Sequence, residues 1–364
     1  MVCAPPTIPP ALSRCLLDWF AVHARALPWR VERTPYRVWV AEVMLQQTRA
    51  ETVVPYYERF MARFPTIEAL AAAPLEDVLR VWEGLGYYAR ARHLHESART
   101  LVASRAGQLP GTYEGLLALP GVGRYVAGAV ASLAFGQDVP AVDGNARRVL
   151  CRLFEVRDDV TRFATQRMLE RLAADLLPPG EAGRFNEALM ELGATLCTPR
   201  APRCPACPLA DRCRAYLRGN PETLPVRGAR RAVPHYDVAA AVLFDHSGRV
   251  LVAQRRADDM LGGLWEFPGG KREPDETLIQ CLMRELREEL GVTVQVEGEQ
   301  AFAVISHAYS HFRMTLHAFR CRLQAGEPQC LDCAALRWVT IVELDDLPMS
   351  VVDRKVARAL ADLS

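Results

Sequence analysis

The chain has 364 residues, of which 50% are hydrophobic and 24% are charged, and its formal net charge is +1. This length favours two domains that can each bury a sizeable core. No run of about eighteen apolar residues occurs, and the first residues lack a basic start followed by an apolar core, so we expect neither a membrane span nor a signal peptide. The 11 cysteines then indicate thiols or metal ligands, not disulfides.

The charge is divided unevenly along the chain. Residues 1–234 hold 30 Arg and 23 Asp or Glu, a net charge of +7, whereas residues 235–364 hold 14 Lys or Arg and 20 Asp or Glu, a net charge of −6. A basic first part suits a polyanionic partner. The only two lysines are Lys271 and Lys355, so the first part contains none.

Thr34-Pro35 is typical of a helix start and predicts a helix over residues 36–50. Glu42 lies on the apolar face of this helix, between Val38 and Leu45. A carboxyl group among apolar side chains has a raised pKa, which suits a general acid near neutral pH. The alternative is a glutamate at the edge of that face with its carboxyl group in water.

Residues 82–92 place two glycines beside two tyrosines and two arginines. Such a stretch can offer a stacking surface and phosphate contacts, although aromatic residues at this density also occur in protein cores. Further along, residues 113–118 and 124–135 have helical patterns, and Gly121 and Gly123 between them allow backbone angles that other residues resist. Backbone amides at such a turn favour an anion, for example a phosphate of DNA.

Asp143 precedes the next predicted helix, which carries an apolar stripe through Val149 and Phe154. A helix N-terminus favours the ionised form of a nearby carboxyl group, so we expect Asp143 to ionise readily. An ordinary turn and helix cap would give the same Asp-Gly-Asn pattern.

Four cysteines crowd one short loop after a predicted helix over residues 184–196. Their C-x6-C-x2-C-x5-C spacing indicates a metal site made by Cys197, Cys204, Cys207 and Cys213. Zinc usually draws on two separated pairs of ligands, whereas four sulfurs in one loop suit a [4Fe–4S] cluster. Nearby arginines predict contact with phosphate, namely Arg200, Arg203, Arg212 and Arg214.

Residues 219–234 are rich in Pro, Gly and Arg and predict a linker. A predicted hairpin opens the next domain, and residues 301–323 alternate as one strand. Between them, a helical spacing places Leu278, Leu282 and Leu286 on one face of a helix. Its other face carries Glu285, Glu288 and Glu289, which can bind a divalent cation on pyrophosphate unless they only form a solvated surface.

These patterns resemble known families. LPGVGR followed by a small-residue helix and VDGN resembles the helix-hairpin-helix DNA glycosylases, and EVMLQQT and GLGYYxRxxxLH are similar to segments of the adenine DNA glycosylase (MutY) family. The cysteine spacing is that of the endonuclease III superfamily cluster loop. Residues 270–292 fit every position of the Nudix box, and Tyr309-Ser310-His311 is similar to the family's Phe-Ser-His loop, with tyrosine in place of phenylalanine.

The resemblance implies roles for individual residues. Glu42 and Asp143 correspond to the catalytic carboxylates, Tyr125 and Asn145 support them, and Glu187 orients the base. The residues expected to contact DNA are Arg30, Gln46, Gln47, Leu85, Tyr87, Gly121, Gly123, Tyr309, Ser310 and His311, of which the last three read 8-oxoguanine.

We therefore expect a multidomain protein: an all-α glycosylase domain over residues 1–218 with an iron–sulfur loop, a linker over 219–234, and an α+β Nudix-like domain over 235–364. The expected function is monofunctional excision of adenine opposite 8-oxoguanine or guanine in duplex DNA, by a cytoplasmic, nucleoid-associated monomer with no membrane partner. The expected cofactors are a [4Fe–4S] cluster and, at the Nudix box, Mg²⁺ with a pyrophosphohydrolase activity. Three alternatives stay open: an endonuclease III-like lyase acting on oxidised pyrimidines, a nucleotide pyrophosphohydrolase with a DNA-binding domain, and a non-catalytic lesion-binding protein.

Overall fold

The computed structural model describes residues 10–228 and 232–363, and the chain in it divides into two compact units. The helical unit comprises Met1–Glu68 and Glu96–Arg230, and the sheet unit comprises Ala69–His95 and Arg231–Ser364. Across the described residues, no helix is both long and apolar enough to cross a membrane.

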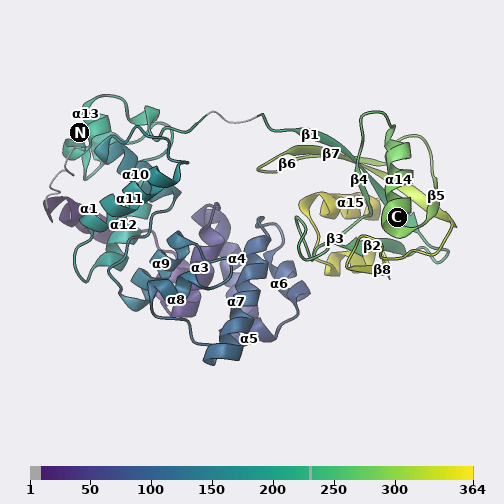
Figure 1. The fold of residues 1–364 in the computed structure, drawn as a ribbon, viewed down its shortest axis with the longest axis horizontal. Helices are drawn as coiled ribbons and strands as arrows, with labels where there is room; N and C mark the ends of the chain where they lie inside the picture. The colour runs from purple at the N-terminus through teal and green to yellow at the C-terminus, as the bar shows by residue number, and fades with distance from the viewer. Residues whose placement is uncertain (1–9, 229–231, 364) are drawn as a thin grey trace. The chain divides into compact units, whose positions relative to one another are not determined.

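The helical unit is built from α-helices and short 3-10 turns (Figure 1). Its helices are α1 (Pro10–His23), α2 (Pro28–Val31), α3 (Pro35–Leu45), α4 (Ala50–Arg63), α8 (Tyr113–Leu117), α9 (Arg124–Phe135), α10 (Gly144–Phe154), α11 (Phe163–Leu176), α12 (Ala182–Thr195) and α13 (Arg214–Leu217). Two further helices, α5 (Ile67–Ala72) and α7 (Ala89–Arg105), begin in one unit and end in the other. Apolar side chains of α1, α10, α11 and α12 form a continuous buried core.

Helix α3 begins as the sequence predicts but ends early. The side chain of Thr34 accepts a hydrogen bond from the backbone N–H of Arg37, which caps the first turn. The helix stops at Leu45 because Gln47 adopts a left-handed backbone conformation, with φ of 58°. The predicted helix over residues 36–50 was therefore too long, and Gln46 and Gln47 lie in the turn that follows it.

The turn between α8 and α9 uses only one of its two glycines for an unusual backbone angle. Gly121 has φ of 70°, in the left-handed region that favours glycine. Gly123 is the N-cap of α9 and has φ of −87°, which any residue can adopt. The expectation that both glycines are needed for their backbone angles is thus wrong for Gly123.

The sheet unit is a mixed eight-stranded sheet with helices. Its elements are α6 (Leu75–Trp82), β1 (His235–Phe244), β2 (Val250–Gln254), β3 (Trp265–Glu266), β4 (Gly269–Lys271), α14 (Leu278–Leu290), β5 (Thr293–Val296), β6 (Ala303–Ala308), β7 (Arg313–Ala325), β8 (Ala335–Val339) and α15 (Val351–Ala361). The central strand β1 pairs parallel with β7, and the strand order is β3-β2-β1-β7-β5, with β8 on β2, β4 on β1 and β6 on β7.

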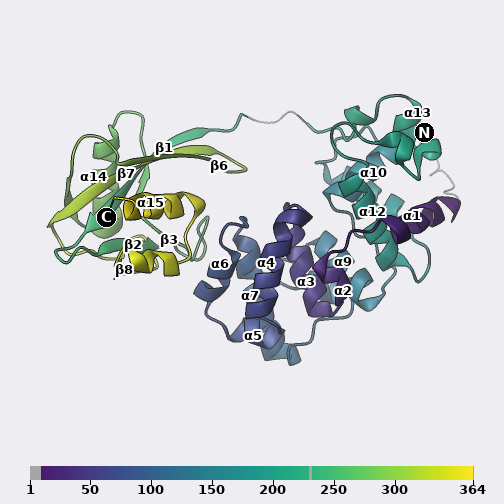
Figure 2. The ribbon, with the colours of Figure 1, turned by 180° about the vertical axis from the view of Figure 1, so that it is seen from behind.

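Alternation along β1 gives the sheet two buried faces. Ala239, Ala241 and Leu243 pack in the core that α14 covers, whereas Ala240 and Val242 pack in the core that α15 covers. Figure 2 shows these two helices with the sheet, seen from behind. The α14 helix begins with a capping box between Thr277 and Gln280 and ends at a left-handed glycine, so the Nudix-box segment has well-defined ends.

Two predicted segments differ from the structure. Residues 301–323 form a hairpin of β6 and β7, not one strand, and Tyr309–Phe312 make its tip, where the backbone N–H of Tyr309 donates to Phe312 O. The first part of the predicted linker is also ordered: Leu224 is buried, and Val226 O accepts a hydrogen bond from the N–H of Val160. Residues 229–231 of that linker lie outside the described residues.

Candidate functional site

Glu42 is a buried carboxyl group in the middle of α3, with only 4% of its surface exposed. Burial raises its pKa to about 7, and the negative charges of Glu187 and Asp143 act in the same direction. The hydroxyl of Tyr125, on α9, donates a hydrogen bond to Oε2 of Glu42 and opposes this rise, as does Arg30. The group can therefore carry a proton near neutral pH, as the sequence predicts.

Asp143 is the N-cap residue of α10. Its Oδ1 accepts from the backbone N–H of Ala146 at 2.7 Å, and its Oδ2 accepts from Nδ2 of Asn145 at 2.9 Å. Burial nevertheless raises the pKa of Asp143 above its usual value, because desolvation outweighs these hydrogen bonds. The expectation that the helix N-terminus would make Asp143 ionise readily is therefore wrong in direction: burial shifts both carboxyl groups the same way.

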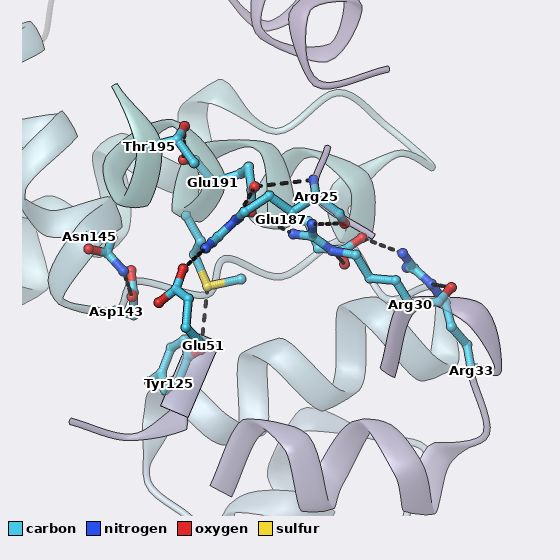
Figure 3. Close-up of polar contacts among 11 residues, drawn as sticks. Arg25, Arg30, Arg33, Glu51, Tyr125, Asp143, Asn145, Glu187, Glu191 and Thr195 are labelled. Carbon is cyan, nitrogen blue, oxygen red and sulfur yellow. Dashed lines mark hydrogen bonds and ion pairs between the residues drawn. The ribbon is translucent and has the colours of Figure 1, made fainter. Parts of the chain in front are cut away.

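Glu187 lies on α12 inside a network of arginines, shown in Figure 3. Its Oε1 accepts from Nε of Arg30 at 3.0 Å, and its Oε2 accepts from Arg33 at 2.7 Å. One turn later, Glu191 accepts from Arg30 at 3.0 Å and from Nε of Arg25 at 2.6 Å. Two carboxylates of one helix thus fix three arginines of the segment around α2.

A chain of contacts connects Asn145 to the cysteine loop. Arg148 donates from Nη2 to Oδ1 of Asn145 at 2.9 Å and to Gly193 O at 2.7 Å, and from Nε to Cys197 O at 2.7 Å. Gly193 lies so close to Asn145 that a Cβ added there would come within 2.7 Å of the Asn145 Cβ. A glycine on α12 therefore leaves room for the side chain that contacts Asp143.

The four cysteines all line one cavity in the helical unit. Arg152, which is almost fully buried, donates to the sulfur of Cys197 at 3.3 Å and to backbone carbonyls of the same loop. Among the residues that the structure describes, no three Cys, His, Asp or Glu side chains are close enough together for a single metal ion.

The expected DNA-contacting residues of the glycosylase part differ in exposure. Gln47 is exposed and Gln46 is partly buried at the end of α3. Leu85 is buried, whereas Tyr87 is 42% exposed in a left-handed conformation, with φ of 50°. Tyr87 therefore projects from the surface of its own segment more than Leu85 does.

Within the sheet unit, Tyr87 reaches the tip of the β6–β7 hairpin. Its hydroxyl lies 2.8 Å from Oγ of Ser310, and either atom can donate. Ser310 and His311 are exposed, whereas the ring of Tyr309 packs against Phe312 and His307 at the edge of the sheet core. Burial raises the pKa of Tyr309 to about 12. The tip thus presents Ser310 and His311 on an aromatic base.

The Nudix-box carboxylates do not share one position. The side chain of Glu285 lies against Gly270, and Arg284 pairs with Glu276 at 2.6 Å and with Glu288 at 3.1 Å. Glu289 accepts from Gly269 N at 3.2 Å, and burial raises its pKa to about 8, with Glu266 and Glu285 adding to the shift. In the described part of the chain these carboxylates do not gather closely enough to count as a site for one ion.

Comparison with known proteins decides the family. A family model described as the HhH-GPD superfamily of base excision DNA repair proteins matches residues 40–179, and a NUDIX domain model matches residues 239–359. The adenine DNA glycosylase of Rattus norvegicus is 36% identical over 400 residues, covering 96% of this chain and 77% of the relative. The adenine DNA glycosylase of Homo sapiens is 37% identical over 402 residues, covering 96% of this chain and 73% of that relative.

The chain belongs to the adenine DNA glycosylase family. It is an enzyme of base excision repair that hydrolyses N-glycosyl bonds. A solved thermostable thymine-DNA glycosylase is 31% identical, with a TM-score of 0.53 over 57% of this chain and 96% of that one. A solved non-covalent endonuclease III–DNA complex is 28% identical, with a TM-score of 0.50 over 58% of this chain and 98% of that one. The helical part of this glycosylase therefore has the endonuclease III fold.

Several residues of the site were not found from the sequence of this glycosylase. Glu191, Arg25 and Arg33 have no motif of their own, and only the four-residue spacing of Glu187 and Glu191 on one helix could have indicated a shared role. Arg148 and Arg152 resemble ordinary polar positions of an amphipathic helix. Their contacts with the cysteine loop depend on tertiary packing, which the local sequence does not encode.

Proposed function

We propose that this glycosylase removes adenine paired with 8-oxoguanine or guanine in duplex DNA, with Glu42 as the general acid. The observation that carries the proposal is the burial of Glu42, because burial raises the pKa of this carboxyl group to about 7 even though Tyr125 donates a hydrogen bond to it. Because Tyr125 donates to Oε2, the second oxygen is left to carry the proton toward the base. Adenine must leave the base stack to reach a group buried this deeply.

Asp143 would act on the sugar once the N-glycosidic bond breaks. The electron pair of that bond leaves with the protonated adenine, and positive charge develops on the sugar ring. Asn145 and the N–H of Ala146 hold both oxygens of Asp143 and favour the anion that stabilises this charge. Glu187, fixed by Arg30 and Arg33, is proposed to orient the base.

The reaction should stop at an abasic site. Related enzymes that also cut the strand carry a lysine directly after the glycine turn and form a Schiff base with the sugar. Here Tyr125 takes that position, and residues 1–270 contain no lysine. Borohydride should therefore trap no covalent protein–DNA adduct through a side chain of the helical unit, and a trapped adduct would contradict this part of the proposal.

We further propose that Cys197, Cys204, Cys207 and Cys213 hold a [4Fe–4S] cluster. They come from one loop and line one cavity, and Arg152 donates to the sulfur of Cys197, a contact that stabilises thiolate charge. The exposed arginines of the loop are then held in place to contact DNA phosphates.

The β6–β7 tip is the proposed reader of 8-oxoguanine. Ser310 and His311 are exposed there with hydrogen-bonding side chains, while Tyr309 fixes the tip to the sheet core. The net charge of −6 over residues 235–364 makes this part a poor binder of DNA on its own, which suits a reader attached to a basic glycosylase.

Base release is the test of the proposed function. Single-turnover assays should use duplexes with A:8-oxoG, A:G, A:C and thymine glycol, and we expect adenine release from the first two. Asp143→Asn is the matched inactive control, because asparagine keeps a helix N-cap while removing the anion. Release of thymine glycol without release of adenine would favour the endonuclease III-like alternative.

A second activity is favoured by one observation in the Nudix box. Burial raises the pKa of both Glu285 and Glu289, with Glu288 adding to the shift of Glu285 and Glu266 adding to that of Glu289, and a bound divalent cation would relieve the repulsion among these carboxylates. Mg²⁺-dependent release of pyrophosphate from 8-oxo-dGTP would support nucleotide hydrolysis if Glu288→Gln abolished it. Absence of this turnover in the wild type would leave lesion reading as the only proposed role of the domain.

A further inference from the structure

Glu191 is a buried carboxylate to which the proposed reaction assigns no role. It is 2% exposed on α12, one helical turn after Glu187. It accepts four hydrogen bonds: from the backbone N–H, Nε and Nη2 of Arg25 at 3.3, 2.6 and 3.2 Å, and from Nη2 of Arg30 at 3.0 Å. Both arginines belong to the segment that runs into α2, so Glu191 ties this segment to α12 (Figure 3).

Arg30 is held on three sides by these contacts. Its Nε donates to Glu187, its Nη2 to Glu191 and its Nη1 to the carbonyl of Arg25. A guanidinium bound in this way has little freedom to rotate, and its side chain is only 13% exposed. Loss of Glu191 would remove one of the two carboxylate partners of Arg30, and one end of its guanidinium would no longer be held.

The position of this charge matters because Arg30 acts on Glu42. The groups that shift the pKa of Glu42 are Tyr125 and Arg30, which lower it, and Glu187 and Asp143, which raise it together with burial. Tyr125 comes from α9, Arg30 from α2 and Glu187 from α12, and Asp143 is the residue that caps α10. The side chain of Glu191 contacts Arg25 and Arg30, so its influence on Glu42 passes through Arg30 and the local charge.

We propose that Glu191 is a positioning residue for adenine excision: it holds Arg30 beside Glu187 and thereby sets the charge around the proton of Glu42. The inference rests on the proposed role of Glu42 as general acid. The simpler alternative is a structural ion pair that only braces α12 against the N-terminal segment. The two differ in one measurable respect, because a brace affects the rate or the stability without moving the pH at which excision declines.

The test compares pH profiles of single-turnover adenine release. Glu191→Gln keeps the shape and one acceptor oxygen but removes a negative charge, so the surroundings of Glu42 become more positive and it loses its proton at lower pH. The alkaline decline of the rate should move to lower pH by on the order of half a unit, with a several-fold loss of rate above the decline. Glu191→Asp keeps the charge, and its decline should stay at the wild-type pH.

Two further variants keep the proposal falsifiable if Glu191→Gln does not fold. Arg25→Gln removes the positive charge that pairs with Glu191. The alkaline decline of the excision rate in this variant should therefore move to higher pH. Glu51→Gln is the control, because it removes the other carboxylate partner of Arg25. The side chain of Glu51 is 71% exposed and its charge is screened by water, so the alkaline decline of the rate in this variant should stay at the wild-type pH.

The possible outcomes distinguish the proposed role of Glu191 from the proposed role of Glu42 as general acid. An inactive Glu42→Gln together with an unmoved decline in both Glu191→Gln and Arg25→Gln would overturn the role of Glu191 and leave Glu42 in place. Equal losses in Glu191→Gln and Glu191→Asp at all pH values would show a structural brace. An active Glu42→Gln would instead overturn the proposed general acid itself.

Discussion

At the scale of single residues, the protonation of Glu42 depends on burial more than on any one neighbour. The side chain of Glu42 is almost fully buried, and desolvation is the largest cause of the raised pKa of its carboxyl group. The hydroxyl of Tyr125 opposes the shift but does not cancel it. A neutral carboxyl group is thereby available at a pH where glutamate in water would be ionised.

This leads to a prediction on pH. Excision by the wild type should fall as the pH rises through about 7, where Glu42 loses its proton, and should also fall at acidic pH, where Asp143 takes up a proton and no longer stabilises the sugar cation. Glu42→Gln should slow single-turnover release by about a hundredfold or more, because the acid acts on the transition state, while lesion-duplex affinity is kept. A wild-type rate that stays flat from about pH 6 to about pH 9 would contradict the assignment.

The same shift has a consequence for stability. The folded-state pKa of Glu42 lies above its usual value of 4.5, so its contribution to the free energy of unfolding is full below that value and is lost as the pH rises through about 7. Glu42→Gln should therefore gain stability relative to the wild type between about pH 5 and about pH 8, as measured by urea unfolding at both values.

Glu42 and Asp143 also show what the sequence could predict about single groups. Glu42 shares the apolar face of its own helix, so the direction of its pKa shift could be predicted from spacing. The cap position of Asp143 could be read as well, and the structure has it at the start of α10. The burial of Asp143 comes from other segments packed around it, and for this reason the predicted direction of its shift was wrong.

At the scale of elements, the close packing of α12 against the start of α10 keeps Asn145 beside Asp143. Gly193 is the point of closest approach, because its missing side chain leaves space for Asn145. We predict that Gly193→Ala displaces Asn145 and lowers single-turnover excision by on the order of tenfold or more. Ala194→Ser, at the exposed neighbouring position, is the control and should keep the wild-type rate. A wild-type rate in Gly193→Ala would show that Asn145 is not needed in this position.

The cysteine loop is an element that depends on its proposed cluster. Cys197→Ser should remove the broad visible absorbance of an iron–sulfur protein and weaken DNA binding, because the arginines of the loop lose their scaffold. Absorbance spectra, iron analysis and duplex titration measure both effects. Cys15→Ser, at an exposed cysteine of α1, is the matched control. Zinc without iron in anaerobically purified protein would contradict the prediction.

The elements were predictable where their signals are local. The sequence predicts α9 with the bounds that the structure has, Arg124–Phe135, and it predicts the leucine face of α14 that packs in the core. The end of α3 was missed, and the loop between β6 and β7 was indicated only by the resemblance of Tyr309-Ser310-His311 to a family loop. Gln47 has no glycine or proline to mark the left-handed turn, and residues 307–312 contain no glycine, proline or asparagine that would mark a hairpin turn.

At the scale of the whole molecule, two parts with opposite net charge share one chain. The basic part holds the proposed chemistry, and the acidic part carries the hairpin tip with Ser310 and His311. The match to adenine DNA glycosylases extends over 96% of the residues, so it includes both parts of the chain. The sheet unit also includes Ala69–His95, and its contact between Tyr87 and Ser310 joins the aromatic segment to the proposed reader.

The last prediction concerns that reader. Ser310 is exposed at the hairpin tip, and its hydroxyl is proposed to bond 8-oxoguanine in place of its contact with Tyr87. Because one neutral hydrogen bond contributes on the order of 1 kcal/mol, Ser310→Ala should reduce the preference for A:8-oxoG over A:G by roughly tenfold or less. The ratio of single-turnover rates on the two duplexes measures it. Ser306→Ala, an exposed serine of β6 that bonds Thr315, is the control and should keep the ratio. An unchanged ratio in Ser310→Ala would place lesion reading elsewhere in the molecule.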